Sequence, residues 1–168
     1  MIGNDIIDLD LAAKESNWQR KGFVDKIFTD REQEMIFSHD VPEIMVWMLW
    51  SMKESAYKVY NRLTARRAYI PQFFECYELD VRPNSATGRV FCDDLIFFTK
   101  TVVTKEFIRT IAVIEEKDLR KVKMIDNEVK IKKTNGVPDF FDKMANEFRP
   151  ISISHHGRFE SLVALSEY

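Results

Sequence analysis

Two short acidic motifs and one histidine motif contain the residue types best suited to chemistry. The motif GNDIID places Asp5 near the start of the chain, and WSMKESAYK places Glu54 and Lys58 four residues apart in the middle. The motif SISHH, near the end, contains His155. Carboxylates, a lysine and a histidine are the side chains that hold a divalent cation on a phosphate and move a group linked to that phosphate.

The two acidic motifs also have plainer interpretations. Asp5 can start a turn or cap the helix that follows it. Glu54 and Lys58 fit an exposed i,i+4 ion pair worth about 0.3–0.5 kcal/mol. However, the stretch before Glu54 is strongly apolar, and Arg62 continues its helical row. A carboxylate followed by cations on the rim of a buried helix suits a metal beside a phosphate-rich ligand.

The histidine motif allows several chemistries. Adjacent His155 and His156 are typical of a polar loop, because neighbours in an extended chain point to opposite faces. No Cys or third His lies nearby, which argues against zinc. A Ser-His-Asp hydrolase would need Ser154 to be activated by a correctly placed base, and the chain has no GxSxG motif.

The elements that must position these residues form a helix-rich first half and a strand-rich second half. Capping signals and helical periodicity predict helices at 8–18, 30–38, 42–63 and 139–148. Runs of β-branched and aromatic residues predict strands at 1–7, 78–82, 89–91, 96–104, 107–114 and 159–166, with turns at 83–88 and 135–138. The predicted fold class is α+β, a long central helix packed on a largely antiparallel sheet, in one domain spanning 1–168.

The composition narrows the class of protein. Of the 168 residues, 45% are hydrophobic, which is enough for a real core. The 25 Lys and Arg against 27 Asp and Glu give a net charge of −2, which argues against a nucleic-acid binder. No signal-peptide pattern opens the chain, and no apolar run approaches the ~18 residues of a membrane span. We expect a cytoplasmic protein in which Cys76 and Cys92 are free thiols.

Two groups of basic residues stand out from this acidic balance. Residues 117–133 hold seven Lys and Arg against three acids, and a second group consists of Lys14, Arg20, Lys21 and Lys26. Each group either attracts an acidic protein partner by electrostatic steering or forms a solvated face without a partner.

Taken together, these motifs resemble those of the 4′-phosphopantetheinyl transferase superfamily, and most closely its small holo-acyl-carrier-protein synthase branch. That branch has a GxDIxE start, a Phe- and Thr-containing segment ending in Glu, a KE(A/S)xxK helix, a Gly-Pro turn and a final SI(S/T)H. The matching segments occur here in the same order, at 3–8, 23–32, 50–58, 136–138 and 152–155. They cover almost the whole chain, so the resemblance implies the fold of that superfamily.

The resemblance implies a reaction. The 4′-phosphopantetheine arm of coenzyme A is transferred to a serine hydroxyl of an acyl or peptidyl carrier protein, as in fatty acid biosynthesis, and adenosine 3′,5′-bisphosphate is released. Asp5 and Glu54 match the magnesium ligands, Lys58 matches the lysine that neutralises phosphate charge and protonates the leaving group, and His155 matches a contact to the coenzyme A phosphates. The serine belongs to the carrier, and Glu54 or a metal-bound water is its candidate base.

Other functions stay open beside this one. A non-catalytic module on the same fold would bind carrier protein or coenzyme A without turnover. An unrelated enzyme acting on nucleotide phosphates would ignore carrier proteins.

The sequence departs from the branch at several positions. Asp8 stands where the branch usually has Glu, Val137 stands where it has Lys, and the stretch 61–67 lacks the usual glycines. The expected contacts to coenzyme A therefore include four further side chains: Arg62, Arg66, Arg67 and Ser154. The resemblance also implies a homo-oligomer, most simply a trimer, in which a neighbouring subunit supplies His155. The basic group that contains Arg20 and Lys21 matches the carrier-docking region.

Overall fold

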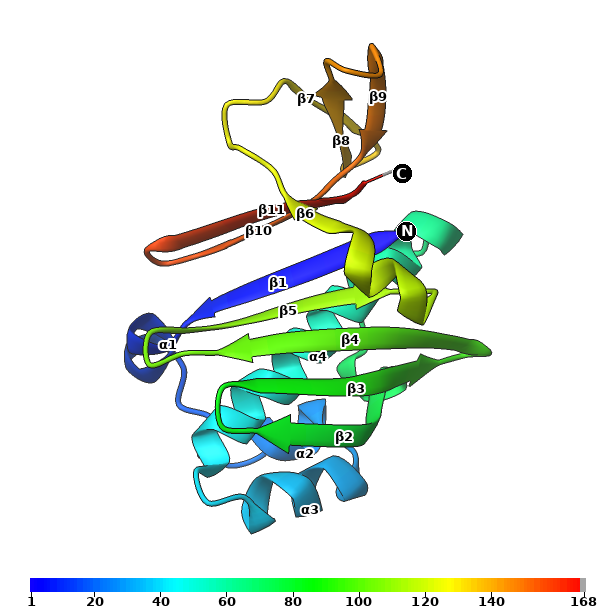
Figure 1. Ribbon diagram of the computed structural model, residues 1–168. Helices are drawn as coiled ribbons and strands as arrows, with labels where there is room; N and C mark the ends of the chain where they lie inside the picture. The colour runs from blue at the N-terminus through cyan, green and yellow to red at the C-terminus, as the bar shows by residue number, and fades with distance from the viewer. Residues whose placement is uncertain (167–168) are drawn as a thin grey trace.

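The computed structural model describes residues 1–166, so the last two residues of the predicted domain lie outside it. Its main sheet is antiparallel, with strands in the order β1-β5-β4-β3-β2. These strands are β1 (Ile2–Asp8), β2 (Glu75–Arg82), β3 (Ser85–Cys92), β4 (Leu95–Val103) and β5 (Phe107–Val113). The long helix α4 (Pro42–Thr64) crosses one face of this sheet (Figure 1). The predicted α+β fold class is therefore confirmed.

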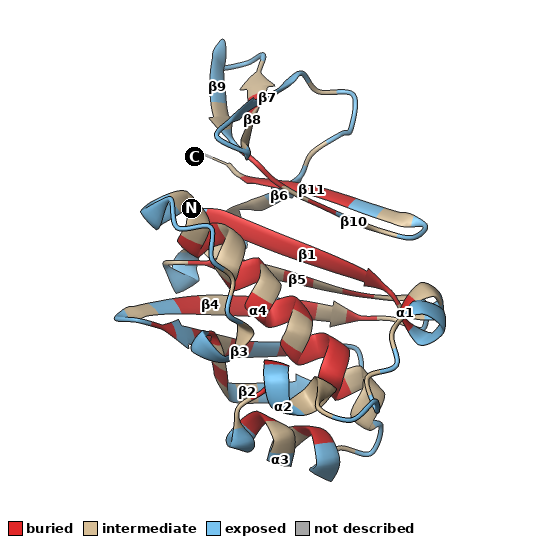
Figure 2. Cartoon of the chain, turned by 180° about the vertical axis from the view of Figure 1, so that it is seen from behind, coloured by how far each residue is buried: buried red, intermediate tan, exposed pale blue. Residues whose placement is uncertain are grey.

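Helix α4, 23 residues long, forms where the sequence predicts it because no Gly or Pro interrupts it after Pro42. Pro42 occupies that first turn, and Ala65 ends the helix in the left-handed region at φ 58°. Residues 45–49 are all buried, so the helix is enclosed on every side in its first half (Figure 2). Gly3 lets β1 approach the helix, since an added Cβ would lie 2.0 Å from the backbone oxygen of Ser55.

There are three shorter helices: α1 (Leu9–Glu15) lies at the end of β1, and α2 (Phe23–Ile27) and α3 (Asp30–Ser38) lie near α4 and β2. The capping box that predicts α3 is present, because Thr29 accepts from the Glu32 N–H and Glu32 accepts from the Thr29 N–H. A 3-10 turn, η1 (Pro71–Phe73), follows α4. Cys76 and Cys92 are free and buried, as predicted. Within residues 1–166, no helix is long and apolar enough to cross a membrane.

The rest of the chain adds two small sheets beyond the edge strand β1 (Figure 1). One has the order β10-β11-β6 and the other the order β7-β8-β9. A 3-10 helix, η2 (Glu116–Lys121), leads into them. Their strands are β6 (Val122–Met124), β7 (Ile131–Thr134), β8 (Val137–Asp142), β9 (Glu147–Pro150), β10 (Ser152–His156) and β11 (Phe159–Leu165).

Several local predictions differ from the structure. The helix predicted at 8–18 spans only Leu9–Glu15, and the turn predicted at 135–138 is too long because β8 begins at Val137. Residues 139–148 form most of the β8–β9 hairpin and not a helix; Phe141 and Phe148 are cross-strand partners with ring centroids 5.3 Å apart, and Asn146 turns the chain at φ 55°. The turn predicted at 83–88 is too long, because β3 already begins at Ser85 and pairs with β4 from that residue.

Candidate active site

Strand β10 attaches to β1 mainly through its side chains. Alternate backbone N–H groups of β1 donate to alternate side chains of β10: Asn4 to Ser152 Oγ at 2.9 Å, Ile6 to Ser154 Oγ at 3.1 Å, and Asp8 to His156 Nδ1 at 2.9 Å. The period-two alternation of a strand explains the spacing, because residues 152, 154 and 156 lie on one face. This contact brings the SISHH motif to the GNDIID motif, 148 residues earlier in the chain.

Asp5 occupies the centre of this junction. Its Oδ1 accepts from the Ser154 hydroxyl at 3.0 Å and lies 3.6 Å from Lys58 Nζ. Its Oδ2 is buried without a hydrogen-bond partner among residues 1–166. Burial raises the pKa of Asp5, and the charge of Lys58 and the bond from Ser154 oppose that rise. A buried carboxylate oxygen without a partner is costly unless a cation or a ligand contacts it.

Glu54 reaches the same junction from α4. Burial, followed by the negative charge of Asp5, raises its pKa to about 7, while Lys58 and Tyr69 oppose the rise. Aromatic rings account for the burial: Tyr69 packs against Trp50 with centroids 6.2 Å apart and against Tyr57 with centroids 4.7 Å apart. The charge of Asp5 raises the pKa of Glu54, so the two carboxylates form a place where a cation is favoured.

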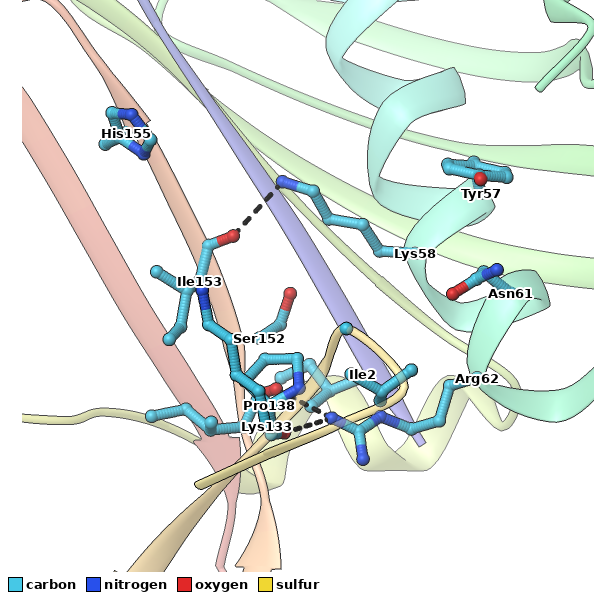
Figure 3. A pocket seen from close by; sticks show the side chains of 13 residues that line it. Ile2, Tyr57, Lys58, Asn61, Arg62, Lys133, Pro138, Ser152, Ile153 and His155 are labelled. Carbon is cyan, nitrogen blue, oxygen red and sulfur yellow. Dashed lines mark hydrogen bonds between the residues drawn. The ribbon is translucent and has the colours of Figure 1, made fainter. Parts of the chain in front are cut away.

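Lys58 ties three elements together at this point. Its ammonium donates to the Asn4 carbonyl of β1 at 2.6 Å and to the Ile153 carbonyl of β10 at 3.3 Å, while its own backbone belongs to α4 (Figure 3). The lysine is therefore fixed beside Asp5 as a positive charge that can contact a phosphate.

The pair Asp5 and Glu54 fits the way magnesium is bound. Magnesium takes one or two protein carboxylates and completes its shell with waters and substrate phosphate oxygens. Within residues 1–166 no group of three or more His, Cys, Asp or Glu side chains is placed to hold a metal. The partnerless Oδ2 of Asp5 supplies a free ligand atom for such an ion.

Two cavities meet at the histidine of β10. The first, which we name the basic cavity, measures about 260 Å³ and is lined by Lys58 and Arg62 of α4, Lys133 of β7, and His155 (Figure 3). The second, which we name the aromatic cavity, measures about 320 Å³ and is lined by Asp5, three rings (Phe23, Trp47 and Trp50), His155 and His156. The two cavities lie next to each other, because they share His155, and Asp5 of the aromatic cavity lies 3.6 Å from Lys58 of the basic cavity.

Comparison with known proteins shows which family has this arrangement. The family model described as the 4′-phosphopantetheinyl transferase superfamily matches residues 1–112, two thirds of the chain. The chain belongs to the 4′-phosphopantetheinyl transferase superfamily. It is accordingly a transferase, and phosphopantetheine is the group transferred in the general sense of that family. No curated protein matches the chain.

The region that matches the transferase family ends within β5, so it includes Asp5, Glu54 and Lys58 but not the later strands. His155 and Ser154 lie outside the matched residues, yet one and the same chain brings them to Asp5. A second subunit is thus not needed to carry His155 to the site. The trimer stays a prediction.

Of the three arginines expected to contact coenzyme A, Arg62 lines the basic cavity, whereas Arg66 and Arg67 do not. Arg62 lines the basic cavity, but its guanidinium donates to Asp139 Oδ1 at 2.9 Å and to the carbonyls of Pro138 and Ile151. Outside that cavity, Arg66 donates to the Tyr60 hydroxyl and pairs with Asp93, while Arg67 donates to the Asn135 carbonyl. The transferase thus uses Arg62 and Arg67 to hold the β7–β8 hairpin, and Arg66 lies on an exposed rim.

The Asp8 carboxylate caps the start of α1 and does not join the pair formed by Asp5 and Glu54. Its Oδ1 accepts from the N–H groups of Asp10 and Leu11 at the start of α1. Arg158 binds both oxygens of the same carboxylate at 2.8 Å, and these bonds hold the pKa of Asp8 well below its usual range. The shorter acid at this position is therefore used to join the β10–β11 turn to α1.

Sequence reasoning missed a buried ion pair one residue before Glu54. Lys53 Nζ lies 2.7 Å from Glu32 Oε2, and both side chains are 0% exposed. The same ammonium donates to the carbonyls of Pro71 and Phe74, so it fixes the loop that carries Tyr69 over Glu54. A lysine inside the apolar stretch of a helix was the signal available in the sequence.

Proposed function

We propose that this transferase moves the 4′-phosphopantetheine arm of coenzyme A onto a serine hydroxyl of an acyl or peptidyl carrier protein and releases adenosine 3′,5′-bisphosphate. The observation that carries the proposal is the pair of Asp5 and Glu54, with Lys58 beside Asp5; Asp5 lines the aromatic cavity and Lys58 lines the basic cavity. Magnesium, held by the two carboxylates, would supply charge stabilisation for the pyrophosphate.

The residues divide the chemistry as follows. The serine oxygen of the carrier forms a bond to the phosphorus that bears the pantetheine, and the bond from that phosphorus to the bridging oxygen breaks. Glu54, or a water that magnesium would hold there, is the candidate base for the serine proton. Lys58, fixed beside Asp5, neutralises the leaving phosphate and donates a proton to it. Ser154 orients Asp5, and His155 contacts the phosphates from β10.

The carrier protein is proposed to dock beside α1. Lys14, Arg20, Lys21 and Lys26 are all exposed on α1, on α2 and on the turn between them. The same helices contribute Ala12 and Phe23 to the aromatic cavity, so an acidic partner bound there would have its serine close to Asp5. Reversing the charge at Arg20 and Lys21 should slow association and weaken its salt dependence, because surface charges act mainly on the encounter rate. Unchanged rates in both variants would show that the group is only solvated.

The test of the reaction is the intact mass of apo-carrier proteins incubated with this protein, coenzyme A and magnesium. A gain equal to the phosphopantetheine group, abolished by a chelator and by Glu54→Ala, would support the proposal. Binding of coenzyme A without any gain would favour the alternative, a non-catalytic module on the same fold. Transfer that persists in both Asp5→Ala and Glu54→Ala would overturn the mechanism.

A further inference from the structure

The basic cavity is closed on one side by a hairpin that the family match does not reach. Residues of β7, β8 and their turn line it: Lys133, Gly136, Val137 and Pro138. All of them lie beyond residue 112, where the match ends. The hairpin therefore contributes side chains from outside the matched residues to the cavity.

Two arginines hold this hairpin against α4. At its tip, Arg67 donates to the Asn135 carbonyl at 2.7 Å. At its base, Arg62 donates to Asp139 Oδ1 and to the carbonyls of Pro138 and Ile151. The Arg62 side chain is only 11% exposed, so this anchor is largely shielded from water. The hairpin is consequently a fixed wall, and the side chains that it presents to the cavity are positioned before a ligand arrives.

The cations of the basic cavity are not equally available to a ligand. Lys58 is committed to Asp5 and two carbonyls at the junction. Arg62 is committed to the hairpin. Lys133 is exposed, and its side-chain ammonium has no hydrogen bond or ion pair within residues 1–166. Lys133 is therefore the lining lysine that can accept a new anion without losing an existing partner.

Coenzyme A carries a second anionic group that needs such a cation. Its pyrophosphate belongs at the Asp5, Glu54 and Lys58 junction, and this placement rests on the proposed function. The nucleotide end then extends into the basic cavity, where Tyr57 and Val137 offer apolar surface to a base. The 3′-phosphate on the ribose is the remaining charge, and Lys133 is the lining lysine or arginine whose side chain has no partner within residues 1–166.

We propose that Lys133, on the β7–β8 hairpin, binds the 3′-phosphate of coenzyme A and makes this enzyme discriminate coenzyme A from 3′-dephospho-coenzyme A. A lysine that contacts a phosphate from a partly solvated wall contributes about tenfold in affinity. The effect should appear in binding and in KM, with kcat preserved, because the 3′-phosphate does not react.

The experiment measures calorimetric affinities for adenosine 3′,5′-bisphosphate and for adenosine 5′-monophosphate, at constant ionic strength and without any carrier. Lys133→Ala is compared with Lys132→Ala. Lys132 is the neighbouring strand residue, does not line the cavity, and lies over the Phe148 ring at 5.8 Å. We expect Lys133→Ala to weaken binding of the bisphosphate about tenfold while leaving the monophosphate unchanged, and Lys132→Ala to change neither.

The outcomes separate this inference from the proposed function. If the wild-type protein binds the bisphosphate and Lys133→Ala binds it equally well, the assignment of Lys133 is overturned and the proposed function stands. Equal losses in the two lysine variants, or equal losses for the two nucleotides, would also overturn it, because a general charge effect would then explain the data. If the wild-type protein binds neither coenzyme A nor the bisphosphate, the proposed function falls together with this inference.

Discussion

Replacing Glu54 by Gln should make the metal-free protein more stable, and the gain should depend on pH. The pKa of Glu54 is raised from 4.5 to about 7 in the folded protein. The folded protein therefore retains a proton that the unfolded chain releases between these two pH values. The contribution of neutral Glu54 to stability is fully present below pH 4.5 and is lost as the pH rises through 7.

The size of the effect follows from that difference. A pKa rise of about 2.5 units, at about 1.4 kcal/mol per unit, corresponds to a penalty of about 3 kcal/mol once Glu54 is ionised. A glutamine of the same shape has no charge to desolvate and no repulsion from Asp5. Glu54→Gln should thus exceed the wild type by about 3 kcal/mol at pH 8 and by almost nothing at pH 4.

Urea unfolding in the presence of a chelator, at pH 4, 6 and 8, measures this difference. The matched control is Glu34→Gln, on the exposed side of α3, which reports the effect of removing one surface carboxylate. Magnesium should then stabilise the wild type more than Glu54→Gln, because binding to the folded state adds to its stability. If Glu54→Gln is less stable than the wild type at pH 8, or if the difference is the same at pH 4 and pH 8, the ionised Glu54 carboxylate beside Asp5 does not destabilise the metal-free protein and this account is refuted.

Two further predictions concern the supports of the site. Lys53→Met should lower the free energy of unfolding, measured in urea, by about 3–5 kcal/mol, because it leaves the fully buried Glu32 carboxylate without its partner. A loss below about 1 kcal/mol would show that water or another cation reaches that carboxylate. Arg158→Ala should lower the free energy of unfolding near neutral pH. The difference in this free energy between the variant and the wild type should shrink as the pH falls below 3.8, because the pKa of Asp8 is held low only in the folded state. An equal gap at pH 6 and pH 3 would contradict the role of Arg158.

The sequence predicted the two longer helices, because their hydrogen bonds and caps join residues that are close in sequence. Helix α3 begins where the capping box indicates, since Thr29 and Glu32 are close in sequence. Helix α4 was predicted to within one residue because a proline starts it and nothing interrupts it. The hairpin at 139–148 was missed because strand pairing depends on residues outside the segment, such as Arg149 opposite Phe140.

The site shows the same division between local and distant information. The i,i+4 spacing of Glu54 and Lys58 was enough to place both side chains on one face of α4. The contact between Ser154 and Asp5 joins residues 149 positions apart, so no periodicity indicates their register. The arginines after α4 were expected to be free for phosphates, but Asp93 and Asn135, both distant in sequence, engage Arg66 and Arg67.

Transfer of phosphopantetheine by wild type and Asp5→Asn, measured by carrier mass across a magnesium titration, tests the central claim most directly. The substitution keeps the shape of the side chain but removes the charge of the buried Oδ2 that has no partner among residues 1–166. The account predicts magnesium-dependent transfer by the wild type and none by Asp5→Asn at any magnesium concentration. Transfer by Asp5→Asn at the wild-type rate and with the wild-type magnesium dependence would contradict it.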